Sequence, residues 1–179
     1  VKCGAVMERE KRLQGIVFLG GRFDYTPADL AMLNVPFVCC SYSNRYGTLI
    51  EGEYSSVSIA DGDTAQQAVE ELYHHGHRRI AALISRPDDQ SISQLRYEGY
   101  IQALESHGIP VDPELVISTG GFDVRDAYSA VKAALERSAD FTALFAIADS
   151  MAIGAMRALM DAGRRIPEDC SVIAIDGLE

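Results

Sequence analysis

Few side chains in this sequence combine the type and spacing that catalysis or metal binding requires. His74, His75 and His77 suggest a zinc site, but neighbouring positions on a helix point about 100° apart. No cysteine or carboxylate completes a tetrahedral ligand set around them. They fall at a predicted helix end, where an imidazole is favoured beside the terminal carbonyls. The sequence therefore predicts no metal site and no cofactor.

Enzyme chemistry is equally poorly supported. Gly20-Gly21 follows a predicted strand, but neither the dinucleotide spacing G-x-G-x-x-G nor the P-loop pattern is present. No nucleophile and base can be paired, because the candidate serines Ser118, Ser129 and Ser138 belong to no motif. We therefore expect a protein that is not an enzyme.

The overall charge excludes one kind of partner for these residues. The net charge is −10, with 47% hydrophobic and 23% charged residues, and the basic residues are dispersed. An acidic surface repels phosphate backbones, so this chain by itself should not grip DNA. If the protein regulates genes, its DNA-binding part lies outside these residues.

The cysteines and apolar runs indicate a cytoplasmic, globular protein. Cys39 and Cys40 are adjacent, so on a strand they point to opposite faces and are poorly placed to bridge each other. With Cys3 and Cys170, they are expected to be reduced thiols. Residues 1–12 lack the apolar stretch of a signal peptide, and no run approaches the roughly 18 residues of a membrane span.

Seven short apolar or β-branched runs alternate with helical patterns. Their continuous apolar character predicts strands covered on both faces, as in a parallel sheet. The expected strands are Gly15–Gly20, Val35–Ser41, Ser55–Ile59, Arg79–Ser85, Leu115–Ser118, Phe141–Ala148 and Ser171–Ile175.

The helices between these runs have legible ends. One is expected from Asp63 to His75, with Gly76 as its stop, and a second from Ser91 or Ser93 to Gly108. A third is expected to start at Asp123. A fourth is expected to start at an N-cap, Asp149, to face inward through Ile153, Met156 and Met160, and to end at Gly163. Such strand–helix–strand units predict a doubly wound sheet.

Several motifs along the chain resemble one family, the LacI/GalR transcriptional regulators. The segment SSVSIADGDTAQQAVEELYHHGHRRIAALIS (55–85), the helix motif R-x-x-G-aromatic at 96–100 and the turn GIPVDP (108–113) all match it. FTALFAIADSMAIGAMRAL (141–159) is the most specific match, and RIPEDCSV (165–172) continues it. The resemblance keeps order and spacing over nearly the whole chain.

The resemblance implies an α/β, two-lobed fold like that of periplasmic sugar-binding proteins, each lobe a doubly wound, mostly parallel sheet. Residues 1–76 would be the incomplete N-terminal lobe of the effector-binding core, and 77–179 its C-terminal lobe. The last expected strand is followed by only a few residues, so the chain looks like a fragment of this fold.

The resemblance also implies a ligand site, at the strand ends where open α/β sheets bind ligands. Arg96, which from spacing alone would be a surface arginine, matches the family's ligand-contacting arginine. Asp176 matches an acidic position that accepts hydrogen bonds from ligand hydroxyls, with a turn residue as the alternative. Phe122 matches a stacking aromatic, with core packing as the alternative.

Two aspartates at helix starts complete the candidate ligand residues. Asp149 could contact ligand, but an N-cap is the stronger interpretation. Of Asp61 and Asp63, one is expected to cap the helix, while the other, for which we take Asp61, could face the ligand.

The chain departs from the family pattern at two positions. Many sugar-responsive relatives carry Asp where this chain has Ala60, and Asn where it has Ala148. Both positions bind hydroxyls in those relatives. Their loss puts an ordinary pentose or hexose in doubt.

The expected function is therefore effector sensing by a repressor-type, cytoplasmic, homodimeric regulator. A sugar, sugar acid or polyol would bind between two lobes and control operator binding by a headpiece absent from this chain. The alternative is a periplasmic sugar-binding protein of an ABC transporter, which has the same fold. A signal peptide or a basic headpiece preceding Val1 would decide between them.

Overall fold

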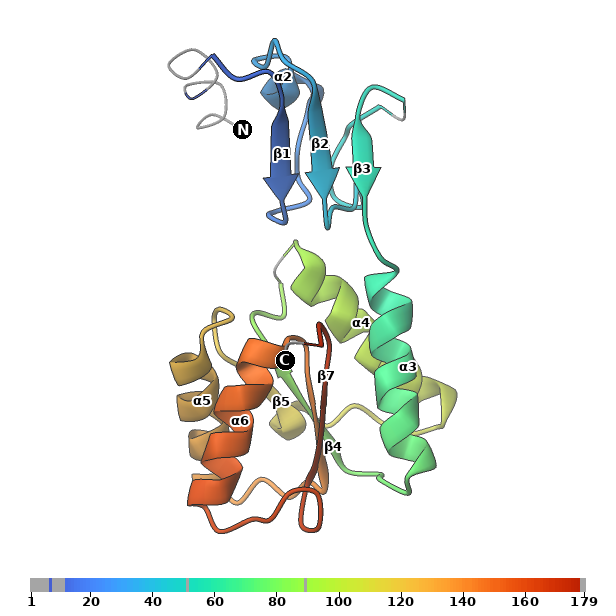
Figure 1. Cartoon of the computed structure of the whole chain (residues 1–179). Helices are drawn as coiled ribbons and strands as arrows, with labels where there is room; N and C mark the ends of the chain where they lie inside the picture. The colour runs from blue at the N-terminus through green and yellow to red at the C-terminus, as the bar shows by residue number, and fades with distance from the viewer. Residues whose placement is uncertain (1–6, 8–11, 51, 89, 178–179) are drawn as a thin grey trace. The chain divides into compact units, whose positions relative to one another are not determined.

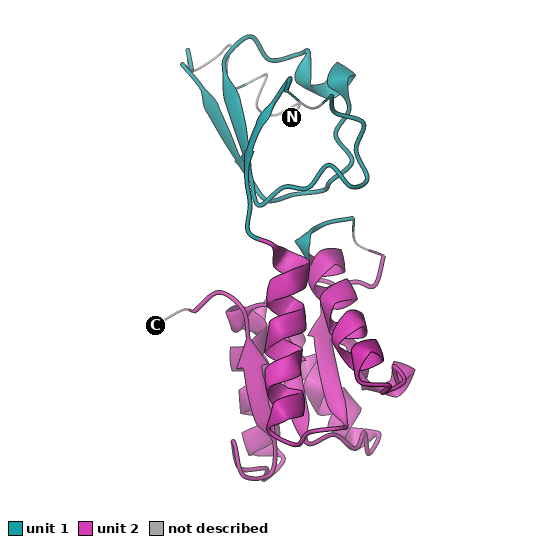
Figure 2. Cartoon of the chain, turned by 90° about the vertical axis from the view of Figure 1, so that its right-hand side faces the viewer, with its two compact units in different colours: residues 1–59, 89–92 teal, residues 60–88, 93–179 magenta. Residues whose placement is uncertain are grey.

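The structure is a computed structural model that describes residues 7, 12–50, 52–88 and 90–177. The chain divides into two compact units, which Figure 2 shows in different colours. The first comprises residues 1–59 and 89–92, and the second residues 60–88 and 93–179. Cys3 and most of the N-terminal segment tested for a signal peptide lie outside the described residues.

The first unit is a three-stranded parallel sheet of order β1-β2-β3 with a short helix, α2. On one face of this sheet, the rings of Phe18 and Phe37 meet edge to face. The rings of Tyr25 and Tyr42 stack on each other nearby, with their centroids 5.4 Å apart. The element bounds are β1 Ile16–Leu19, α2 Pro27–Leu30, β2 Phe37–Cys40 and β3 Ser55–Val57.

The other face of this sheet is exposed along its two edge strands, β1 and β3. Val17 and Leu19 alternate with the inward residues of β1 and are 60% and 82% exposed, and Val57 on β3 is 65% exposed. The expectation that every strand is covered on both faces is therefore wrong for β1 and β3.

The second unit is a four-stranded parallel sheet of order β5-β4-β6-β7. Every residue of β4 and β6 is buried, as their continuous apolar runs predict. Tyr100 stacks on Phe145 of β6, and its hydroxyl donates to the carbonyl of Ile80 at 2.9 Å. The bounds are β4 Ile80–Ile84, β5 Val116–Ser118, β6 Ala143–Ala146 and β7 Ser171–Ala174.

Two helix pairs cover this sheet, one pair on each face (Figures 1 and 2). Helices α3 and α4 lie on one face, and α5 and α6 on the other. The bounds are α3 Asp61–His74, α4 Ile92–Ser106, α5 Val124–Glu136 and α6 Asp149–Asp161, and a 3₁₀ turn, η1 (Pro113–Leu115), precedes β5. None of the described helices is long and apolar enough to cross a bilayer.

One glycine in each pair lets the two helices touch. A Cβ on Gly99 of α4 would overlap the carbonyl oxygen of Gly62 and come within 2.9 Å of the Cβ of Ala65 on α3. Gly154 of α6 meets Val124 and Ala127 of α5 in the same i, i+3 pattern. In each pair, this close contact is made by the start of the first helix.

The boundary between the two compact units falls between Ile59 and Ala60, whereas the lobe boundary was expected after Gly76. Helix α3 belongs to the second unit because it packs on β6 and β7 and against α4. The lobe boundary expected at residue 76 refers to the complete two-lobed fold and stays a prediction.

Some helix ends were predicted correctly from the local sequence, and others were not. Asp123 caps α5, accepting from the backbone N–H of Arg125 at 2.8 Å, and Gly76 and Gly163 follow helix ends with positive φ, as expected. The N-cap predicted at Asp149 is wrong. Ala148 is the N-cap of α6 and makes no side-chain cap bond, and Asp149 is the first helical residue.

Helix α3 also begins without the aspartate cap that the sequence predicts. Ala60 is its N-cap and makes no side-chain cap bond, so neither Asp61 nor Asp63 caps the helix. Asp61 instead lies in the first turn with its carboxylate buried.

The predicted inward face of α6 is also wrong. Ile153 and Met160 are 54% and 53% exposed, and Met156 is 36% exposed. The buried side of α6 faces the sheet and α5. It consists mainly of small residues, with Met151 and Leu159 as the two larger ones. The buried set is Met151, Ala152, Gly154, Ala155, Ala158 and Leu159.

Cys39, Cys40 and Cys170 are free thiols, as predicted for these three. Cys170 is fully buried, and burial raises its pKa to about 11. At pH 8 only about one thiol in a thousand is then ionised. We expect iodoacetamide to leave Cys170 unmodified in the folded chain and to alkylate it after unfolding, as measured by peptide mass spectrometry. The half-buried Cys40 is the internal comparison, and equal labelling of the two would contradict the prediction.

Candidate functional site

Candidate ligand residues gather at the carboxyl edge of the second sheet. The four strands are parallel, so their carboxyl ends meet at one edge. Helices α4, α5 and α6 each follow a strand and begin there, and α3 also begins there, with Asp61 buried in its first turn.

Arg96 lies at the centre of this edge and is only 5% exposed. Its Nε donates to Oδ1 of Asp61 at 2.9 Å, and its Nη1 lies 3.3 Å from Oδ1 of Asp176. Nη1 also donates to the carbonyl oxygen of Ile147, at the end of β6. One guanidinium therefore joins α3, α4, β6 and the end of β7. We call Arg96, Asp61 and Asp176 the Arg96 cluster.

The two carboxylates of the cluster have different surroundings. The side chain of Asp61 is 3% exposed, and that of Asp176 is 42% exposed. Burial raises the pKa of the Asp61 carboxyl, and the hydrogen bond and charge of Arg96 offset only part of that rise. Asp61 is thus an internal counterion for Arg96, whereas Asp176 presents a carboxylate to solvent.

The backbone of Asp176 is unusual. Its φ is +127°, a region that side-chain-bearing residues rarely adopt, and Gly177 follows at +76°. Such a conformation costs on the order of 1–3 kcal/mol and persists at ligand sites where the surrounding structure enforces it. In this conformation Oδ1 of Asp176 lies 3.3 Å from Nη1 of Arg96.

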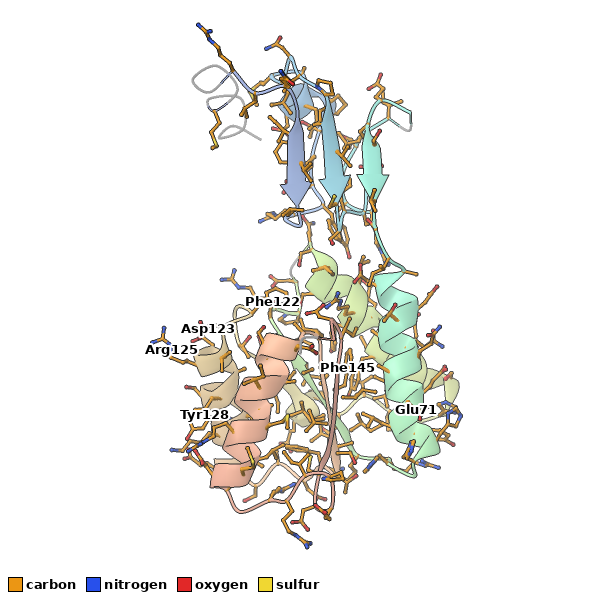
Figure 3. The ribbon with its side chains drawn as sticks, in the orientation of Figure 1. Glu71, Phe122, Asp123, Arg125, Tyr128 and Phe145 are labelled. Carbon is orange, nitrogen blue, oxygen red and sulfur yellow. The ribbon has the colours of Figure 1, made fainter. Side chains whose placement is uncertain are left out.

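The remaining two predicted residues, Phe122 and Asp149, lie at the starts of α5 and α6. Phe122 lies in the loop before α5 (Figure 3) and is 39% exposed. Its carbonyl accepts a hydrogen bond from the hydroxyl of Ser150 at 2.8 Å. Its ring is therefore not core, which removes the core-packing alternative. Asp149 lies in the first turn of α6, next to Ser150.

His75 and His77 make contacts with different parts of the chain. His77 bridges Thr142 and Ser171 through its two ring nitrogens at 2.9 and 3.0 Å, and burial lowers its pKa. His75 contacts the carbonyl of Glu71 at 2.9 Å. Among the described residues, no group of three His, Cys, Asp or Glu could hold a metal ion.

A separate hollow of about 510 Å³ lies on the outer face of the α5–α6 pair, away from the Arg96 cluster. Apolar side chains and two arginines line it, and three of its exposed apolar residues, Ile153, Met156 and Met160, are those wrongly expected to face inward. We call this set the α5–α6 face: Val124, Arg125, Tyr128, Ile153, Gly154, Met156, Arg157 and Met160.

Sequence reasoning found three members of the Arg96 cluster but missed how they pair. Asp61 and Arg96 are 35 positions apart, and the Ile147 carbonyl is 51 positions from Arg96. No local pattern carries this information, because the contacts depend on how α3, α4 and β6 pack.

Known proteins resemble this chain closely. Residues 69–179 match the family described as the periplasmic binding protein-like domain. The transcriptional regulator MalR of Clostridium butyricum is 36% identical over 172 residues, which cover 96% of this chain and 50% of that protein. The chain thus spans about half the length of the curated relatives it matches.

Two solved structures agree with this similarity. The complex of the transcriptional regulator CelR with cellobiose superposes with a TM-score of 0.81 at 33% identity, covering 97% of this chain and 52% of that one. A sugar-binding LacI-family regulator from Escherichia coli, complexed with phosphate, gives 0.78 at 30% identity, covering 99% and 62%.

These relatives are regulators, not enzymes or binding proteins of transporters, and the parallel α/β architecture is part of their two-lobed core. The chain therefore belongs to the periplasmic binding protein-like family, and over nearly its whole length it is similar to part of LacI-family transcriptional regulators.

Proposed function

We propose that this domain senses a small sugar-like effector for a repressor-type regulator of transcription that acts in the cytoplasm. The observation that carries the proposal is the convergence of Arg96, Asp61 and Asp176 at the carboxyl edge of the second sheet. The half-exposed Asp176 carboxylate can accept hydrogen bonds from ligand hydroxyls. Phe122, whose ring is partly exposed, would stack on an apolar sugar face, and Asp149 would contact ligand from the first turn of α6.

Control of DNA binding would pass through a headpiece outside these residues. The net charge of −10 supports this assignment, because the chain itself repels a phosphate backbone. An effector changes the regulator only through its different affinities for two arrangements of the protein. The relative solved with cellobiose supports a sugar as the class of effector.

The sugar proposal predicts a specific loss in one variant. Replacing Asp176 by Ala removes charge-assisted hydrogen bonds, each worth roughly 1.5–3 kcal/mol, so effector affinity should fall about tenfold or more. A thermal-shift screen of sugars and polyols would identify the effector, and calorimetry would measure the affinity.

Asp123→Ala is the matched control for this measurement. It removes the N-cap of α5, which costs about 1 kcal/mol of stability, but should leave affinity unchanged. If Asp176→Ala binds the effector as well as the unmodified chain does, the site lies elsewhere. If no sugar or polyol binds the intact protein, the proposed effector class is wrong.

We also propose that the regulator is a homodimer paired through the α5–α6 face. Ile153 and Met160 are more than half exposed on this face, beside a hollow lined mainly by apolar side chains. Arg157 pairs with Asp161 at 2.9 Å at its rim, so both signs of charge are present for an isologous contact.

The dimer proposal predicts that Ile153→Glu with Met160→Glu gives a monomer. Both side chains are exposed, so the stability of the protomer should change little. Sedimentation equilibrium of the intact protein at micromolar concentration measures the effect. Ile50→Glu, an equally exposed apolar position in the first unit, should leave the dimer intact. An undisturbed dimer in the double variant would place the interface elsewhere.

A further inference from the structure

The Arg96 cluster carries more negative than positive charge. Arg96 contributes one positive charge, and Asp61 and Asp176 each contribute a carboxylate within 3.3 Å of it. Asp61 is almost fully buried and takes the Nε donor, and the carbonyl of Ile147 takes another donor from Nη1. The guanidinium is thus neutralised inside the protein before a ligand arrives.

The helix starts near the cluster also carry negative charge of the protein's own. The amino end of a helix attracts anions through its dipole and free N–H groups. Here the first turn of α3 carries Asp61 and Asp63, and the first turn of α6 carries Asp149. Two positions that could have attracted an anionic ligand already carry the protein's own carboxylates.

We propose that Asp61 sets the charge selectivity of this site, so that it rejects carboxylate- and phosphate-bearing ligands and accepts neutral or amino-bearing polyhydroxyl compounds. This inference rests on the proposed function and narrows its effector class.

The physical reason is competition for Arg96 and repulsion by Asp176. A ligand carboxylate that took the Nε donor of Arg96 would displace Asp61, leaving that carboxylate buried without its partner, which is costly. It would also approach the half-exposed Asp176, and juxtaposed like charges oppose binding. A hydroxyl or ammonium group instead donates to Asp176 and leaves the Asp61–Arg96 pair in place.

The test follows the Nε–H resonance of Arg96 in the ¹⁵N-labelled 179-residue chain. The titrants are acetate as a bare carboxylate, and glucose, glucosamine and glucuronate as one sugar skeleton with three charges, all at constant ionic strength. In the unmodified chain, we expect acetate and glucuronate to leave the resonance unmoved. Asp61→Asn and Asp176→Asn each remove the excess negative charge, so both should produce saturable shifts with acetate and glucuronate, at least about tenfold tighter than any in the parent.

Two comparisons keep the test decisive. Asp63→Asn removes an exposed carboxylate from the same helix turn and should behave like the parent. Asp176→Asn changes a half-exposed side chain, so it tests the charge argument even if Asp61→Asn fails to fold. Saturable binding of acetate or glucuronate at Arg96 in the parent, with an affinity like that of the variants, would overturn the inference. So would variants that gain no anion binding.

The outcomes also separate this inference from the proposed function. If sugar acids bind the parent tightly at Arg96, the selectivity is wrong but the sensor function stands. If no sugar of any charge binds, while the two variants gain acetate binding at Arg96, the charge assignment holds and the sugar-sensing function fails.

Discussion

Replacing Arg96 by Ala is expected to lower the free energy of unfolding by about 3–5 kcal/mol, because it leaves a buried carboxylate without its counterion. Asp61 is 3% exposed on its side chain, and its recorded partner is the Arg96 Nε at 2.9 Å. The carbonyl of Ile147 loses a charged donor in the same substitution. Urea unfolding followed by circular dichroism gives the loss directly.

Sequence alone suggests the opposite result, since an arginine one turn into a helix is ordinarily solvated and dispensable. Two further variants test the reason for the loss. Arg96→Met combined with Asp61→Asn removes both charges and should recover much of the lost stability. Arg96→Lys keeps the charge but not the planar fork, and should fall between the parent and the Ala variant. A loss below about 1 kcal/mol for Arg96→Ala would show that the pair is solvated.

Gly99→Ala and Gly154→Ala should each destabilise the second unit by about 1–3 kcal/mol, although alanine is the better helix former by roughly 1 kcal/mol. At both positions the new methyl group would overlap a backbone carbonyl oxygen of the partner helix, that of Gly62 or Val124. The helices must separate to admit it, because backbone cannot move aside as a flexible side chain can. Chemical unfolding measures the change.

Gly121→Ala is the matched control. No atom lies within 4 Å of the Cβ position at Gly121, and its φ lies outside the positive region where a side chain is strained. That variant should be neutral or slightly more stable, because alanine restricts the unfolded chain. If Gly99→Ala or Gly154→Ala were stabilising, helix propensity would outweigh packing and the close helix contacts would be absent in solution.

Much of the fold could be predicted because its signals are local. All seven strands occur within the predicted runs, and Gly76, Gly108 and Gly163 follow helix ends in the left-handed conformation that glycine adopts without strain. The cap at Asp123 needs only its own helix. These features depend on residues that are near neighbours in the chain, so they can be predicted from the sequence alone.

Cap assignment by residue type failed at the starts of α3 and α6. Neither Asp61 nor Asp63 caps α3, and Asp149 does not cap α6, because Ala60 and Ala148 occupy the two N-cap positions. The Asp61 carboxylate pairs instead with a guanidinium from another helix. A carboxylate can satisfy either demand, and only the packing of α3 on α4 determines which one it meets.

The chain's own sequence determined the strands, most helix ends, the family and three residues of its candidate site. Only the tertiary structure decided which side of α6 is buried. Helix α6 is apolar around much of its circumference, and its small residues pack inward because Gly154 must touch α5, so Ile153, Met156 and Met160 remain outside. It likewise decided that Arg96 is an internally neutralised arginine, because its partners come from segments 35, 51 and 80 positions away that only folding brings together.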